Sequence, residues 1–114
     1  MDIRYLGKNL RVTDGIKEHL KEKLEKFDKY APRIVESHVV LKKEKLLYEA
    51  EVTVLAKNLR AFGEGQSKDN IYTAIDQAAV RVEKQLKRYR EKIKDHKHKH
   101  RDVIHIESES ESEL

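Results

Sequence analysis

The chain contains no cysteine, and this absence removes several kinds of chemistry from consideration. Disulfide bonds, thiolate nucleophiles and zinc sites built from cysteine are all excluded. The chain also lacks the roughly 20 consecutive apolar residues that a membrane-spanning helix requires. The first residues, Met1 to Arg4, show no apolar segment of the kind found in secretory signals. Together these absences predict a cytoplasmic protein that makes no contact with a membrane.

Groups of residues that would indicate catalysis are also lacking. Only four glycines are present, none in a phosphate-binding loop, and the sequence suggests no pairing of a nucleophile with a base. His96, His98 and His100 alternate with lysines, which repel cations, and no carboxylate completes a metal site there. We therefore expect a protein that is not an enzyme and that needs no cofactor and no metal.

The chain does have abundant charge, and this charge is segregated. Charged residues make up 40% of the 114 residues. Residues 80–101 hold ten Lys or Arg against three Asp or Glu, whereas residues 102–114 hold five Asp or Glu and no Lys or Arg. The length allows one modest core. We expect one domain at residues 1–101, followed by an acidic tail at residues 102–114 that has too few apolar residues to fold.

The strongest periodic pattern predicts one long helix over residues 69–101. Its apolar residues recur at spacings of three and four, and they are Ile71, Ile75, Ala78, Val82, Leu86, Tyr89 and Ile93. The opposite face is basic, with Lys84, Lys87, Arg88 and Lys94 flanked by Arg81, Arg90 and Lys92. Like charges three or four residues apart destabilise a helix by roughly 0.2–0.5 kcal/mol per pair. A polyanionic partner is the simplest explanation for such a face.

A second helix is expected earlier in the chain, and its charge is balanced. Thr13 is the predicted N-cap, Pro32 is the predicted end, and the apolar residues between them are Ile16, Leu20, Leu24, Phe27 and Tyr30. Residues 13–30 hold five lysines and five acidic residues, which is typical of a solvated surface. Lys23 is different because it lies beside the apolar stripe. It either packs its stem there or presents its ammonium in the groove between the two helices.

Four strands are expected, at about residues 3–6, 35–42, 48–57 and 60–66. Alternation predicts a core-facing side for the second strand, with Val35, Ser37, Val39 and Leu41. The third strand is expected to present Tyr48, Ala50, Val52, Val54 and Ala56 on one face. In the last strand, Gly63 and Gly65 permit close backbone approach beneath a helix, and Ser67 or Asp69 caps the helix that follows. The order β-α-β-β-β-α predicts an α+β fold, an antiparallel-rich sheet covered on one face by two helices.

Two segments of the long helix carry a family resemblance. Residues 69–76 read DNIYTAID and residues 81–89 read RVEKQLKRY. With the spacing of Leu20, Leu24 and Phe27 after Thr13, they resemble the signature of the ribosome hibernation promoting factors. That family is also called ribosome-associated inhibitor, protein Y or sigma-54 modulation protein. The resemblance covers about the first hundred residues, and one departure is Asn70-Ile71, where the family usually has Asp-Met or Asp-Leu.

The resemblance implies a fold and a function. The fold is a β-α-β-β-β-α domain with two helices on one face of a four-stranded sheet, similar to a double-stranded RNA-binding domain. The implied function is a translation inhibitor that binds the 16S rRNA of the small ribosomal subunit during stasis or stress, where it occludes the mRNA and tRNA channel. We expect a protein that is monomeric off the ribosome. The predicted rRNA-binding residues are Lys23, Arg81, Lys84, Lys87, Arg88, Arg90 and Lys94.

Three alternatives remain open at this point. A general double-stranded RNA binder would read A-form shape through phosphates and 2′-hydroxyls. A protein-interaction module would form a homodimer through the open sheet face, which carries Val40, Leu55 and Phe62. The chain is also compatible with the N-terminal part of a long hibernation factor cut within its linker, since long members carry a further domain that pairs ribosomes.

Overall fold

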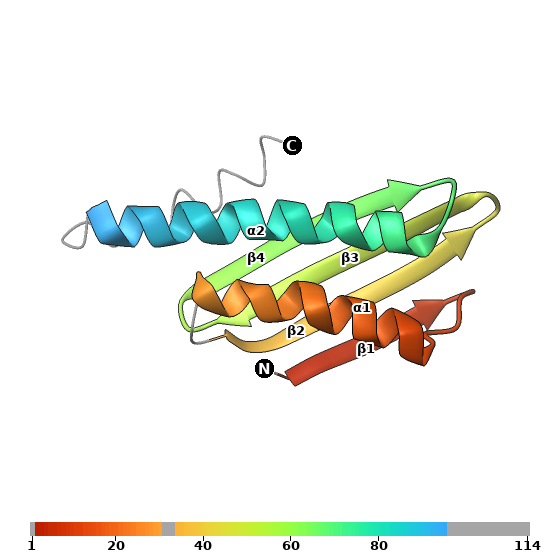
Figure 1. Cartoon of the computed structure of the whole chain (residues 1–114), viewed down its shortest axis with the longest axis horizontal. Coiled ribbons are helices and arrows are strands. Elements are labelled where there is room, and N and C mark those ends of the chain that lie inside the picture. Colours follow the sequence, from red (N-terminus) through yellow and green to blue (C-terminus); the bar gives the residue numbers. More distant parts are fainter. Residues whose placement is uncertain (1, 31–33, 96–114) are drawn as a thin grey trace.

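Two helices lie side by side on one face of a four-stranded sheet and leave the other face open (Figure 1). This computed structural model describes residues 2–30 and 34–95, and the predicted acidic tail lies outside them. In chain order the elements are β1 (Asp2–Lys8), α1 (Asp14–Glu25), the 3₁₀ helix η1 (Lys26–Lys29), β2 (Ile34–Glu44), β3 (Leu47–Ala56), β4 (Leu59–Ser67) and α2 (Ile71–Asp95). The β-α-β-β-β-α order and the α+β class predicted from the sequence are confirmed.

The strands lie in the sheet in chain order, β1-β2-β3-β4. Strand β1 runs parallel to β2, and the other two pairs are antiparallel. Parallel neighbours require a crossover connection, and α1 provides it. The two antiparallel pairs are joined by tight turns in which Lys45 and Asn58 adopt positive φ angles. This topology makes β1 and β4 the two edge strands, and α2 lies along β4.

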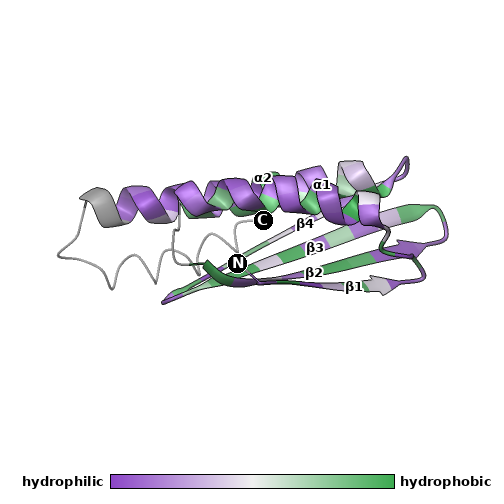
Figure 2. Ribbon diagram, turned by 60° about the horizontal axis from the view of Figure 1, so that its bottom comes forward, coloured by the Kyte–Doolittle hydropathy of each residue, from purple (hydrophilic) through white to green (hydrophobic). Residues whose placement is uncertain are grey.

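The core lies between the sheet and the helices. Alternate residues of β3 are fully buried, as the sequence predicted for Ala50, Val52 and Val54. From α2, the apolar stripe contributes Val82 and Leu86, which are also fully buried. In Figure 2 the apolar colouring gathers between the two layers, and the outer helix surfaces are hydrophilic. Burial of this stripe holds α2 on the sheet and directs its polar residues outward.

Two glycines of β4 allow α2 to lie unusually close to the sheet. A Cβ atom added to Gly65 would lie 2.2 Å from the Ala74 carbonyl oxygen, and one added to Gly63 would lie 2.4 Å from that of Ala78. Real Cβ atoms do not approach backbone oxygens this closely. The predicted close approach beneath the helix is confirmed, and it fixes the distance of α2 from β4.

The start of β2 differs from the sequence prediction. Val35 was expected to face the core, but its side chain is 62% exposed, while the neighbouring Ile34 is buried. The pairing of β2 with β3 shifts register between Ile34 and Glu36. Such a bulge inserts one extra residue and reverses the alternation on either side of it. The strict alternation predicted from Val35 was therefore wrong at its first residue.

The helix ends also differ in part. Thr13 caps α1 as predicted, since its Oγ1 accepts a hydrogen bond from the Ile16 amide at 3.2 Å. The α-helix ends at Glu25, and the turn that buries Phe27 is 3₁₀. The predicted cap of α2 was wrong, because Asn70 takes that position and its Oδ1 accepts from the Thr73 amide at 2.8 Å. Pro32 and residues 96–101 lie outside the described residues.

Candidate nucleic-acid interface

The outer surface of α2 carries most of the basic residues predicted to bind RNA. Five of the predicted seven lie on it with exposed side chains, namely Arg81, Lys84, Lys87, Arg88 and Arg90. Lys94 belongs to the same helix, but its side chain lies outside the described part of the chain. Among the residues that the structure describes, none forms an ion pair with Lys84 or Lys87. Their charges are therefore available to a polyanion.

These residues divide between two flanks of the helix. Successive residues are 100° apart around an α-helix, so positions seven apart lie on nearly the same line. Arg81 and Arg88 share the line that faces the edge of β4. Arg90 shares the other line with Glu83, on the flank that faces α1, and Lys87 lies beside it. The predicted basic face is thus divided into one flank beside β4 and one flank beside α1, and Lys84 lies between the two flanks.

On the first flank, three side chains of α2 bind the outer edge of β4. The amide of Gln66 donates to Gln77 Oε1 at 3.1 Å, and Arg81 donates to the Glu64 carbonyl oxygen. Gln85 makes two bonds to Phe62, since its Oε1 accepts from the Phe62 amide and its Nε2 donates to the Phe62 carbonyl oxygen. The three side chains are four residues apart, so each successive helical turn supplies one. Arg81 therefore has a structural role in addition to its predicted role.

One bond to a carbonyl does not exhaust the Arg81 guanidinium. The group carries five N–H donors in a planar fork, and the side chain is exposed. The remaining donors suit a phosphate, which guanidinium groups bind through two parallel hydrogen bonds. Its anchoring to β4 restricts the side chain before any partner arrives, which reduces the conformational entropy that binding must remove.

On the second flank, polar contacts join α1 and η1 to α2. Asp76 Oδ1 lies 2.7 Å from His19 Nε2 and 3.5 Å from Lys23 Nζ. Seven residues after Asp76 on α2, Glu83 Oε2 accepts a hydrogen bond from the Tyr30 hydroxyl at 3.1 Å. The ammonium of Lys23 therefore lies in the groove between the helices, which was one of its two predicted placements. Asp76 neutralises part of its charge, so Lys23 differs from the unpaired lysines of α2.

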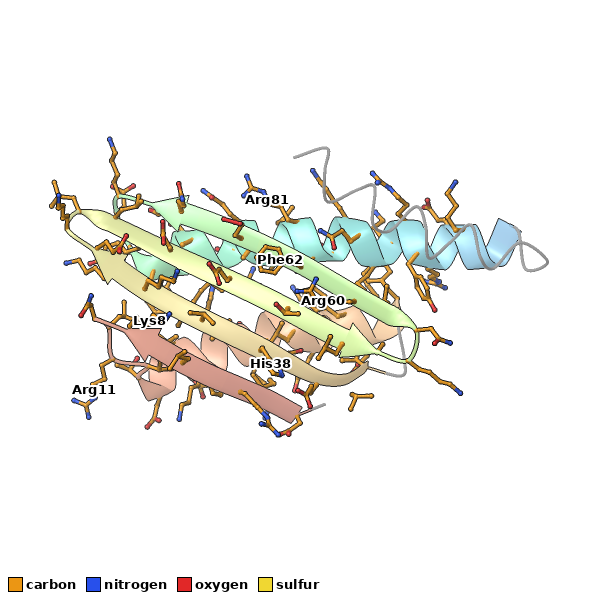
Figure 3. All side chains as sticks on the ribbon, turned by 180° about the vertical axis from the view of Figure 1, so that it is seen from behind. Lys8, Arg11, His38, Arg60, Phe62 and Arg81 are labelled. Carbon is orange, nitrogen blue, oxygen red and sulfur yellow. The ribbon has the colours of Figure 1, made fainter. Side chains whose placement is uncertain are left out.

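The open face of the sheet is mixed in character. Val40 lies between Leu6 and Glu51, and Leu55 lies between Glu36 and Arg60, so apolar residues are mixed with charged ones across the strands. On this face the hydrogen bond between His38 and Glu36 lowers the pKa of the Glu36 carboxyl below its usual value. Figure 3 shows this face, with His38, Arg60 and Phe62 on it. The described residues of this face therefore form a mixed surface, unlike the large apolar surface that an obligate dimer buries.

Sequence reasoning missed the partners that hold the basic side chains. Asp76 and Gln85 were read only as parts of the family motifs, and Gln77 was not considered. A signal for the glutamines was present, because Gln77, Arg81 and Gln85 recur every four residues beside the apolar stripe. The pairing of Lys23 with Asp76 joins two helices that are far apart in sequence, and neither residue by itself indicates it.

Two kinds of feature are absent from the described residues. None of the helices found there is both long and apolar enough to cross a membrane. In the same part of the chain, no group of three or more His, Asp or Glu side chains is placed to hold a metal ion. His96, His98 and His100, which the sequence analysis did not expect to bind a metal, lie outside the described residues.

Comparison with known proteins adds a family. Residues 3–94 match the model of a family described as sigma 54 modulation protein / S30EA ribosomal protein. A ribosome hibernation promoting factor of Escherichia coli (strain K12) is 32% identical over 98 residues, which are 84% of this chain and all of that relative. A factor of the same name from Azotobacter vinelandii is 28% identical over 92 residues, which cover 81% of this chain and 85% of that relative.

Solved structures with the same fold are also similar. The N-terminal domain of Thermus thermophilus Protein Y superposes with a TM-score of 0.71 at 32% identity, covering 78% of this chain and 99% of that one. A ribosomal subunit interface protein from Coxiella burnetii gives a TM-score of 0.73 at 20% identity, covering 80% and 99%. At that lower identity, the second likeness supports the fold alone.

Proposed function

Because the chain belongs to the family of sigma 54 modulation proteins and S30EA ribosomal proteins, we propose that it is a ribosome hibernation factor. It binds the small ribosomal subunit through 16S rRNA and inhibits translation during stress or stationary phase. It acts in the cytoplasm, where ribosomes are, and it performs no catalysis. The relatives with this name cover most of the chain and support the proposal.

The proposed mechanism is occlusion. A folded domain that holds fixed cations against rRNA phosphates occupies the channel through which mRNA and the tRNA anticodon ends pass. Occlusion requires a rigid domain and no catalytic group. The fully buried stripe of α2, with Val82 and Leu86, provides this rigidity. Release depends on competition for the same phosphates, so binding weakens as the salt concentration rises.

The observation that carries this proposal is the pair of lysines on α2 that form no ion pair with any described residue. Lys84 and Lys87 are exposed, and no described residue neutralises either of them. Residues 13–30, which include α1 and η1, carry five lysines and five acidic residues. A merely soluble surface needs no such asymmetry between neighbouring helices. The rRNA contacts are assigned to Arg81, Lys84, Lys87, Arg88 and Arg90, with Lys94 continuing the row and Lys23 at its border.

Sucrose-gradient sedimentation tests this proposal directly. The protein is added to separated small subunits, large subunits and intact ribosomes, and each fraction is probed for it. We expect co-migration with small subunits and intact ribosomes but not with large subunits. A profile in which the protein stays at the top of every gradient would contradict the proposal. The same gradients report whether ribosomes pair.

General double-stranded RNA binding is the alternative that the fold itself suggests. A gel shift with a free RNA duplex separates the two, since a shape reader binds any A-form helix of sufficient length. We expect the duplex to bind far more weakly than small subunits at physiological salt. The alternative of a homodimer through the open sheet face has less support, because charged residues interrupt Val40, Leu55 and Phe62 there.

A further inference from the structure

A groove runs along the outer side of β4, where the open face of the sheet meets α2. It has a volume of about 800 Å³ and opens to solvent. That volume lies within the range of small-molecule sites, about 300–1,000 Å³. The side chains that line it come from these two elements, and they are Arg60, Phe62, Glu64, Gln66, Gln77 and Arg81. The groove lies apart from the lysines that carry the proposed function.

An aromatic ring forms part of the groove, and a side chain of α2 holds the backbone that presents it. Phe62 lies on the open face of the sheet and is partly exposed. Its amide donates to Gln85 Oε1 at 2.9 Å, and its carbonyl accepts from Gln85 Nε2. The glutamine therefore fixes the strand at the residue that presents the ring. A backbone fixed before binding reduces the conformational entropy that is lost when a ligand stacks on the ring.

Two guanidinium groups flank this ring. Arg60 lies two residues earlier on the same face of β4, and Arg81 reaches the groove from α2, so that Phe62 lies between them in Figure 3. Both side chains are exposed. Guanidinium groups bind phosphates through paired hydrogen bonds. Gln66 Nε2 donates to Glu49 Oε2 at 3.2 Å, and Gln77 Oε1 accepts from the Gln66 amide. The Glu64 carboxylate, Gln66 Oε1 and Gln77 Nε2 add acceptors and a donor of the kind that recognise base edges.

The hydrogen bonds of β4 exclude one common occupant of a sheet edge. A peptide that binds by adding a strand requires free backbone N–H and C=O groups along that edge. Here side chains of α2 already bind the amide of Gln66, the carbonyl of Glu64 and both backbone groups of Phe62. An added strand would have to displace all of them. What remains accessible is a ring, two cations and polar side chains.

We propose that this groove binds an unpaired nucleotide of single-stranded RNA. The base stacks on Phe62, and the phosphates on either side of it contact Arg60 and Arg81. Every base has a π-face, so stacking of this kind requires an accessible base more than a particular sequence. Bases inside a duplex are stacked on one another and cannot reach the ring. Arg81 also belongs to the basic surface of α2, so a strand that leaves the groove continues toward Lys84 and Arg88.

The chain contains no tryptophan, which gives the test a clean signal. In the Phe62→Trp variant the only indole lies in the groove, and a stacked base quenches its fluorescence. We expect saturable quenching by a single-stranded RNA of ten nucleotides and none by the same strand in a duplex. The matched control is Val35→Trp, at a site that is 62% exposed on the bulge of β2. Its fluorescence should stay constant in both titrations.

Affinity provides the second readout. Stacking on an aromatic ring is worth about 1–3 kcal/mol per base, so Phe62→Leu should weaken single-strand binding by roughly 5- to 150-fold. Phe62→Tyr keeps the ring and should retain the affinity. Thermal denaturation of each variant establishes that it is folded. Unchanged affinity in a folded Phe62→Leu protein, or a Phe62→Trp signal that RNA does not alter, would overturn the inference.

Failure of this inference can be told apart from failure of the proposed function. The titrations use RNA alone, whereas the proposed function is judged by sedimentation with ribosomal subunits. Quenching without co-sedimentation would leave the groove established and refute ribosome binding. Co-sedimentation without quenching would support ribosome binding and refute RNA binding in the groove.

Discussion

Leu86 contributes to stability in a way that its neighbour on the helix cannot. Its side chain is fully buried, whereas the side chain of Lys87 is exposed and has no ion-pair partner among the described residues. Truncating a buried leucine to alanine removes apolar contacts and leaves a cavity, at a typical cost of about 2–5 kcal/mol. Leu86→Ala should therefore lower the midpoint of chemical denaturation strongly, and Lys87→Ala should leave it nearly unchanged. Equal shifts in the two variants would show that the helix faces are assigned wrongly.

Glu36 and His38 form a hydrogen-bonded pair on the open face of the sheet. The hydrogen bond from His38 lowers the pKa of Glu36 in the folded protein. A lowered carboxyl pKa adds stability above the pKa of the unfolded chain, and this contribution is lost as the pH falls through the folded value. His38→Ala should raise the pKa of Glu36 toward the ordinary glutamate value. An NMR titration of the Glu36 carboxyl carbon measures this, and identical titration in both proteins would refute the pairing.

Individual residues also mark where sequence reasoning reached its limit. Exposure of Lys84 and Lys87 followed from helical periodicity, because the apolar stripe determines which side faces water. The placement of Lys23 remained open between two possibilities, since its partner Asp76 lies on another helix. The exposure of Val35 was predicted wrongly, because a bulge depends on how β2 pairs with β3 and leaves no clear mark in β2 alone.

At the scale of elements, the seat of α2 on β4 depends on two glycines. A methyl group at Gly65 would meet the Ala74 carbonyl oxygen at 2.2 Å, and backbone atoms cannot move aside singly. Gly65→Ala should therefore push the helix away from the strand. Overpacking typically costs roughly 1–3 kcal/mol, and we expect this substitution to destabilise the protein by at least that much. Thermal denaturation measures the loss.

Gly15 provides the control for this substitution. It lies in the first turn of α1, and a Cβ atom there would lie 3.3 Å from the Tyr72 hydroxyl and 3.9 Å from Thr13 Oγ1, with no backbone atom as close. The Tyr72 side chain is 40% exposed and can shift. Replacing glycine by alanine in a compatible helix usually stabilises by about 0.4–1 kcal/mol. Gly15→Ala should leave stability unchanged or slightly higher, and similar losses in both variants would contradict the close packing at β4.

The elements themselves were largely predictable, and their ends were not. Periods of two and of 3.6 residues reflect burial of one face, so the strands and both helices followed from the positions of apolar residues. The caps depend on local hydrogen bonds that several residues could make, and Asn70 took the place expected for Ser67 or Asp69. The hydrogen bonds from α2 to the edge of β4 depend on the packing distance that Gly63 and Gly65 allow.

For the whole molecule, the basic surface and the core are parts of one arrangement. The stripe of α2 binds the sheet, the sheet edge anchors Arg81, and α1 holds Lys23 beside Asp76. The remaining cations of α2 project from this rigid support. The sequence predicted which residues are basic and exposed. It could not predict that they divide between two flanks, because that division depends on where β4 and α1 lie around the helix.

Reversal of charge on α2 tests the central claim most directly. The variant Lys84→Glu, Lys87→Glu, Arg88→Glu is compared with Lys8→Glu, Lys21→Glu, Lys45→Glu, which changes the net charge equally at exposed positions away from α2. Co-sedimentation with small ribosomal subunits is measured for both, after circular dichroism has established that both are folded. We predict that the α2 variant no longer co-sediments and that the control still does. Binding retained by the α2 variant, or lost equally in both, would contradict the account.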